Sequence, residues 1–109
     1  MRNQKSIGMA CLLAVIPFSA AHALDIKLPN ETATYKASDL PGFQRAQQKC
    51  LICHSAEYAQ YQPPSSPRAY WLATVKKMRK PFGAPLDDTD IEQITDYLVK
   101  TYGNEQAKK

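Results

Sequence analysis

Apolar residues recur at helical spacing in three stretches of the chain, within residues 39–54, 66–81 and 87–103. The residues on the three faces are Phe43, Ala46, Gln47, Cys50, Trp71, Val75, Met78, Ile91, Ile94, Leu98 and Tyr102, all apolar except Gln47. No internal repeat is present, and no stretch shows the sustained alternation of a strand. The pattern therefore predicts an all-α fold with about three helices.

Capping residues indicate where these helices begin and end. The candidate N-caps are Ser38 or Asp39, Ser66, and Asp87 or Asp88. We expect the first helix to end near His54, the second to stop at Pro81, and the third to take Gly103 as its C-cap. Residues 55–66, which are rich in tyrosine, proline and serine, are predicted to form a loop.

The first 23 residues are typical of a cleaved secretory signal peptide. Arg2 and Lys5 precede an apolar stretch over residues 7–20, and Ala21-His22-Ala23 supplies a small-x-small cleavage pattern. The apolar stretch is shorter than the about 20 residues that a membrane span needs, so a retained anchor is the weaker alternative. We therefore expect export to the periplasm, cleavage after Ala23, and no membrane span in the mature chain.

The mature chain would comprise residues 24–109, an extended segment over 24–36 followed by one small domain over 37–109. Loss of Arg2 and Lys5 lowers the formal net charge from +4 to +2, which does not indicate nucleic acid as a partner. Only 15 of the 86 residues are Leu, Ile, Val or Phe. A domain with such a small core usually needs an additional stabilising element, so we expect a bound group to complete the core.

The main functional motif of the chain is the run Cys50-Leu51-Ile52-Cys53-His54. Its C-x-x-C-H spacing is the attachment signal for a c-type haem. Each thiol adds to one vinyl group of the porphyrin, and the histidine is then held below the ring as an axial iron ligand. The spacing predicts one covalent haem c, with Cys50 and Cys53 as thioethers and His54 on the iron.

Other functions of this motif have less support. A structural zinc site usually needs four Cys or His ligands, and after the leader the chain offers only Cys50, Cys53 and His54. A thioredoxin-like pair would accompany a βαβ pattern, which is absent. A plain disulfide is possible but leaves His54 unexplained.

Met78 is the candidate for the second axial position on the iron. It is the one methionine after the leader, where no histidine other than His54 occurs. Ligation by His54 and Met78 would give a closed, electron-transferring iron with a raised potential. In the alternative, Met78 is only the last core residue of its helix. The second axial position is then filled by a lysine or left open for a small ligand.

Four cations bracket Met78, namely Lys76, Lys77, Arg79 and Lys80. Charged residues on a helix usually form a solvated face, and that interpretation stays open. In the functional interpretation, they surround the exposed haem edge and steer an acidic partner.

The mature chain resembles the class I cytochromes c. Gly42 matches a glycine, eight residues before the first attachment cysteine, that lets the first and last helices cross closely in that family. The family's aromatic residue four before that cysteine is replaced by Ala46, and Phe43 is expected to pack against Tyr97 and Leu98 instead.

A closer resemblance is to the cytochrome subunit of bacterial sulfite dehydrogenase. It is carried by CLICHSAEY at 50–58, YQPPSSPRAYW at 61–71, TVKKM at 74–78 and PFGAPL at 81–86. The resemblance implies a periplasmic heterodimer in which a molybdenum-cofactor subunit oxidises sulfite. The small haem subunit, without catalytic chemistry of its own, passes the electrons to a soluble cytochrome c.

Two other functions stay open at this point. A free-standing periplasmic electron carrier needs only the haem, whereas a gas sensor would need a five-coordinate iron. The sequence does not identify the surface that meets a partner or the role of residues 24–36.

Overall fold

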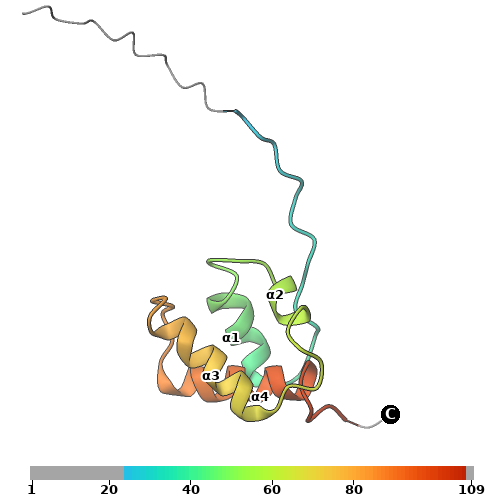
Figure 1. Ribbon diagram of the computed structural model, residues 1–109, viewed down its shortest axis with the longest axis vertical. Coiled ribbons are helices and arrows are strands. Elements are labelled where there is room, and N and C mark those ends of the chain that lie inside the picture. Colours follow the sequence, from blue (N-terminus) through green and yellow to red (C-terminus); the bar gives the residue numbers. More distant parts are fainter. Residues whose placement is uncertain (1–23, 108–109) are drawn as a thin grey trace, which may run out of the picture.

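The computed structural model describes residues 24–107, and this part of the chain is all-helical, with no strand (Figure 1). Its helices are α1 (Pro41–Lys49), α2 (Glu57–Gln60), α3 (Arg68–Arg79) and α4 (Asp88–Thr101). The all-α prediction is therefore confirmed for these residues. The predicted signal peptide lies outside the described residues.

Helix α4 is the centre of the packing, because both α1 and α3 lie against it. It is buried over most of its length, with Ile94 and Val99 fully covered. From α3, Trp71 and Val75 complete the same core. Their burial at i and i+4 agrees with the predicted apolar face of this helix.

The crossing of α1 and α4 depends on a glycine. A Cβ atom at Gly42 would fall on the backbone carbonyl oxygen of Gln93 and lie 2.8 Å from the Cβ of Tyr97. Next to it, the Phe43 ring lies 5.7 Å from the Tyr97 ring, measured between centroids. The close approach expected at Gly42 and the packing of Phe43 on Tyr97 are both present.

The start of α4 is fixed by a capping box. The Asp87 carboxylate accepts from the Asp90 backbone N–H at 2.7 Å, and the Asp90 carboxylate accepts from the Asp87 N–H at 3.2 Å. This reciprocal arrangement satisfies two backbone donors that a helix start leaves free. The predicted cap at Asp87 is therefore confirmed.

The end of α4 differs slightly from expectation. Tyr102, not Gly103, is the C-cap. Gly103 lies one position later, where a Cβ atom would be 2.6 Å from both the Ser66 carbonyl oxygen and the Trp71 Nε1. Glycine is needed here for close packing.

Four other boundaries correct the sequence-based expectations. Helix α1 has Leu40 as its N-cap and no side-chain cap, so neither Ser38 nor Asp39 caps it. Helix α1 ends at Lys49 instead of near His54, so the cysteine motif lies in turns. The expected loop contains the short helix α2, whose four residues are too few to show a period. Helix α3 begins after Pro67, because the Ser66 hydroxyl donates to the Pro63 carbonyl at 2.6 Å and does not cap it.

The extended segment at the amino-terminal side has two parts. Residues 24–32 are exposed and non-helical, whereas Tyr35 is 6 % exposed and packs edge-on against Tyr97. At the next residue, the Lys36 backbone N–H donates to the Tyr102 hydroxyl at 2.9 Å, and its carbonyl accepts from the Tyr97 hydroxyl at 2.7 Å. The segment is thus attached to α4 at its end only.

Candidate functional site

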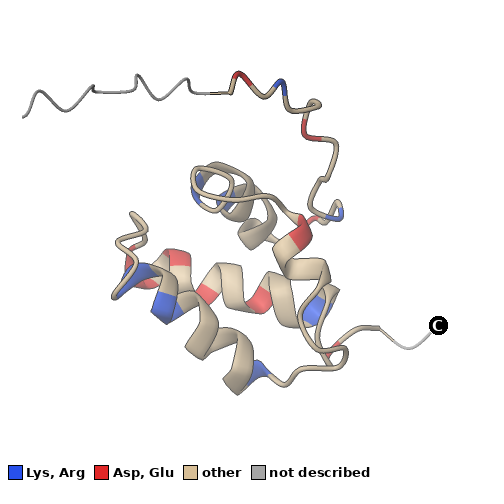
Figure 2. Cartoon of the chain, turned by 45° about the horizontal axis from the view of Figure 1, so that its top comes forward, with Lys and Arg blue, Asp and Glu red and all other residues tan. Residues whose placement is uncertain are grey.

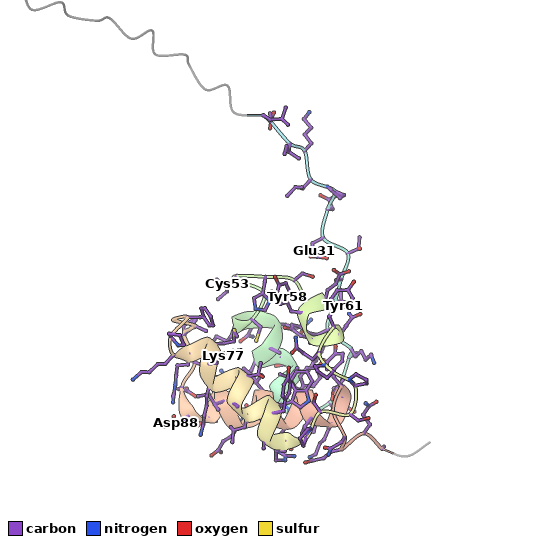
Figure 3. All side chains as sticks on the ribbon, viewed as in Figure 1. Glu31, Cys53, Tyr58, Tyr61, Lys77 and Asp88 are labelled. Atoms are coloured by element: carbon purple, nitrogen blue, oxygen red, sulfur yellow. The ribbon has the colours of Figure 1, made fainter. Side chains whose placement is uncertain are left out.

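The cysteine motif begins where α1 ends. Cys50 is the C-cap of α1, and its backbone N–H donates to the Ala46 carbonyl at 2.9 Å. Cys53 and His54 lie in the turn and bend that follow the helix. Both thiols are free, with Cys50 half-buried and Cys53 exposed. Cys53 and Tyr58 lie on the same side of the domain (Figure 3).

Cys50 faces the core. It packs against the buried cluster, and burial raises the pKa of its thiol, an effect that the neighbouring Tyr35 hydroxyl partly offsets. Burial also raises the pKa of the Tyr35 hydroxyl, with a further contribution from Cys50. Both groups therefore stay protonated at neutral pH.

His54 is half-buried and is held by two neighbours. Its Nδ1 lies 3.4 Å from the Ser55 carbonyl oxygen. Its ring stacks on Tyr58 with the centroids 4.3 Å apart. In the tautomer that donates from Nδ1, the lone pair of Nε2 is left to bind a metal ion.

Met78 lies in the last turn of α3, on the apolar face that begins with Trp71 and Val75. Unlike these two residues it is only half-buried. Its backbone carbonyl accepts from the Ala84 N–H at 2.8 Å, which ties the loop after α3 to this position. The backbone at Met78 is thus tied to the following loop, while its side chain is only partly covered.

Large apolar side chains are exposed around these elements. Leu51 and Ile52 in the motif, Tyr58 and Tyr61 beyond it, and Phe82 after α3 all face solvent to a large extent. By contrast, two surface depressions between α3 and α4, lined by Leu72 and Glu92 among others, contain no motif residue. Several of the exposed apolar side chains of the described chain thus lie on segments that carry or follow the motif and Met78.

These residues fit a covalently attached haem. The donor set supplies two free thiols on one turn, an imidazole with a free ring nitrogen and a half-exposed thioether. They do not fit a structural metal site, because residues 24–107 contain no group of three or more His, Cys, Asp or Glu side chains that could hold an ion.

Cations gather at the end of α3 (Figure 2). Arg79 is engaged, since it donates to the Asp88 carboxylate at 2.6 Å. Lys76, Lys77 and Lys80 are exposed. Of the four cations around Met78, three thus present their charge to solvent and one anchors the start of α4.

Only some of the residues near the motif could have been predicted from the sequence. Tyr58 follows His54 at a spacing of four, which could have suggested their contact. Tyr35 gave no such signal, because it lies in a segment without any period, and only the fold brings it to Cys50.

No family model matches the chain, and no curated protein matches it. No helix of residues 24–107 has the length and apolar character needed to cross a bilayer.

Proposed function

We propose that this chain is a class I cytochrome c with one haem c, bound covalently through Cys50 and Cys53 and ligated by His54 and Met78. The observation that carries the proposal is the C-x-x-C-H motif, which lies in turns after α1 with both thiols free and with the histidine ring stacked on Tyr58. Exposed apolar side chains on the same and neighbouring segments support it.

The residues around His54 have a defined task in this proposal. In the tautomer that donates from Nδ1 to the Ser55 carbonyl, Nε2 would be free to bind iron, and the stacked Tyr58 ring would restrict the plane of the imidazole. Both contacts come from residues directly after the motif, so the ligand is oriented locally.

When bound, the haem supplies a one-electron Fe(III)/Fe(II) couple. A thioether from Met78 favours the ferrous state and so raises the potential. The Met78 carbonyl accepts from the Ala84 N–H, so the turn that would supply this ligand is tied to the loop after α3. The chain is then an electron-transfer protein of the periplasm and needs no catalytic residue of its own.

We further propose that the chain is the haem subunit of a molybdenum sulfite dehydrogenase, by its resemblance to that cytochrome. Oxidation of sulfite to sulfate releases two electrons, so a single haem would accept them from the molybdenum subunit one at a time and pass each to a soluble cytochrome c. The exposed lysines at the end of α3 suit an acidic partner surface.

The test is to co-produce the chain with the molybdenum subunit of its host and to add sulfite. The proposal expects a stable heterodimer in which sulfite reduces the haem, and in which added oxidised cytochrome c is then reduced. A haem protein that never forms this complex, even at low salt, would instead be a free-standing carrier.

A further inference from the structure

The first described residues present an apolar face to solvent. Leu24, Ile26 and Leu28 are 82 %, 65 % and 81 % exposed, and they alternate with Asp25 and Lys27. In an extended chain, alternate side chains point to the same side. These five residues, here called the arm, therefore have one apolar side and one charged side, although the alternation is too short to predict a strand from sequence.

The arm leaves the domain from a fixed point. Lys36 is held by the hydroxyls of Tyr97 and Tyr102, and its side-chain nitrogen lies 5.0 Å from the centre of the Tyr102 ring. Tyr35 is buried beside it. Ala33 also packs against the core, whereas residues 24–30 are all exposed and extend away from the helices (Figures 1 and 3). The arm therefore begins only a few residues beyond a fixed point of the fold.

The backbone of the arm has no partner within the described chain. No hydrogen bond in residues 24–107 involves a backbone group of residues 24–30, and this part of the chain contains no strand with which the arm could pair. Backbone N–H and C=O groups that become buried must find partners. The edge of a β-sheet in another molecule would supply such partners along the whole arm while its apolar side is buried.

We propose that the arm adds as a strand to the exposed edge of a β-sheet in a partner protein, with Leu24, Ile26 and Leu28 entering an apolar groove beside that edge. This is a known mode of peptide recognition, in which the backbone supplies affinity and alternate side chains supply specificity. A second copy of the arm does not suffice, because an isolated pair of short strands is marginally stable in water. A membrane surface is disfavoured, since Asp25 cancels the charge of Lys27.

Pro29 sets the register of this added strand. Proline lacks an N–H and is tolerated in an edge strand only where that position faces away from the neighbour. Residues 25, 27 and 29 share one backbone orientation, so Asp25 and Lys27 also face away. The amides of Ile26 and Leu28 are then the donors to the partner sheet.

The inference uses the molybdenum subunit as its probe and so rests on the proposed function. In the complex of that subunit with the full mature holo-protein, hydrogen exchange should slow at the amides of Ile26 and Leu28 and stay fast at Asp25 and Lys27. Contacts through side chains alone would not produce this alternation.

Matched variants provide the second measurement. Replacing Leu24, Ile26 and Leu28 together by serine should weaken the complex by roughly 100-fold, because each apolar side chain contributes a factor of several on burial. Replacing Asp25 and Lys27 by serine should change the affinity by less than about twofold. The haem spectrum should be unchanged in both, since the arm does not contact the helices.

The outcomes separate the two proposals. If the triple substitution does not change the affinity, or if the arm amides exchange fast in the complex, the proposed role of the arm is wrong. The proposed function is not affected by either result. Self-association of the chain that the triple substitution abolishes would show that the occupant is a second copy. Failure of the unchanged chain to bind the molybdenum subunit contradicts both.

Discussion

Met78 is the side chain whose role is least obvious from its surroundings. It follows Trp71 and Val75 on the apolar face of α3, but Trp71 is 1 % exposed and Met78 is half-buried. Leu72 on the same helix is also half-buried, but it packs against the core cluster, whereas Met78 is not part of that cluster. This position is compatible with a ligand whose partner group completes the burial.

Replacing Met78 by alanine therefore tests the axial ligand. In the oxidised holo-protein, Met78→Ala should remove the weak red absorption band of methionine-ligated haem and lower the reduction potential. The adjacent exposed Lys77→Ala is the control and should leave the band in place. If the band and the potential both survive Met78→Ala, this methionine is a core residue only.

Gly42 offers a test of the helix crossing. In Gly42→Ala, the new methyl group meets the Gln93 carbonyl oxygen and the Tyr97 Cβ, so α1 must move away from α4. We expect a loss of about 1–3 kcal/mol in the free energy of unfolding, as for other overpacked sites. Guanidinium unfolding of the holo-protein measures it.

The control for Gly42→Ala is Gln47→Ala, at an exposed position of the same helix. It should change the free energy of unfolding by less than about 0.5 kcal/mol. Equal effects of the two substitutions would mean that the crossing does not depend on the glycine.

Single residues of the site could be predicted where their role depends on neighbours close in the sequence. The cysteine spacing, the adjacent histidine and Gly42 are all recognisable without a fold. Tyr35 could not be found, because its contacts with Tyr97 and Cys50 join segments far apart in the chain.

At the element scale, an ion cluster joins the start of α3 to the end of α4. Arg68 donates to Asp96 at 2.9 Å and to Glu105, and Lys100 donates to Asp96 at 2.9 Å. Hydrogen bonding from Arg68 lowers the pKa of Glu105. Burial opposes ionisation of Asp96, but hydrogen bonds from Lys100 and Arg68 outweigh it and lower the pKa of this carboxyl too.

These shifts predict how acid acts on the fold. A carboxyl group whose pKa is lowered by folding stabilises the native state above its ordinary pKa, here 3.8 for Asp96 and 4.5 for Glu105. The contribution is lost as the pH falls below these values. From about pH 7 to about pH 3, the free energy of unfolding should thus decrease more in the unchanged chain than in Arg68→Gln.

Chemical unfolding of the two holo-proteins across this range gives the comparison. Lys49→Gln is the control, because Lys49 contacts the Pro85 carbonyl and no carboxylate. It should keep the full pH dependence. Parallel curves for Arg68→Gln and the unchanged chain would show that the cluster does not contribute.

The boundaries of the helices show which elements a sequence can define. The start of α4 was predictable because Asp87 and Asp90 form a capping box within four residues. The end of α1 was not, since no glycine or proline follows Lys49 before the turns of the motif. Helix α2 has a single turn and therefore no period to detect.

At the scale of the whole molecule, charge is concentrated at one end of α3. Lys76, Lys77 and Lys80 are exposed there, whereas Lys100 lies near the opposite end of α4. Because long-range attraction depends on where charge is placed, Lys77→Glu should slow association with the molybdenum subunit and weaken its salt dependence.

Lys100→Glu changes the net charge by the same amount and is the matched control. Association rates measured at several salt concentrations should fall by several-fold for Lys77→Glu and little for Lys100→Glu. Faster dissociation with an unchanged association rate would instead place Lys77 inside the interface. Equal effects of the two reversals would exclude a role of this end of α3.

The central claim is that Cys50 and Cys53 hold a haem covalently, and the mass of the mature protein from its host tests it most directly. The account predicts a chain that begins at Leu24 and carries one haem, which stays attached through acid-acetone extraction and denaturing electrophoresis. The double variant Cys50→Ala, Cys53→Ala should lack it under the same treatment. Haem that washes out of the unchanged chain, or a mature chain without haem, would contradict the account.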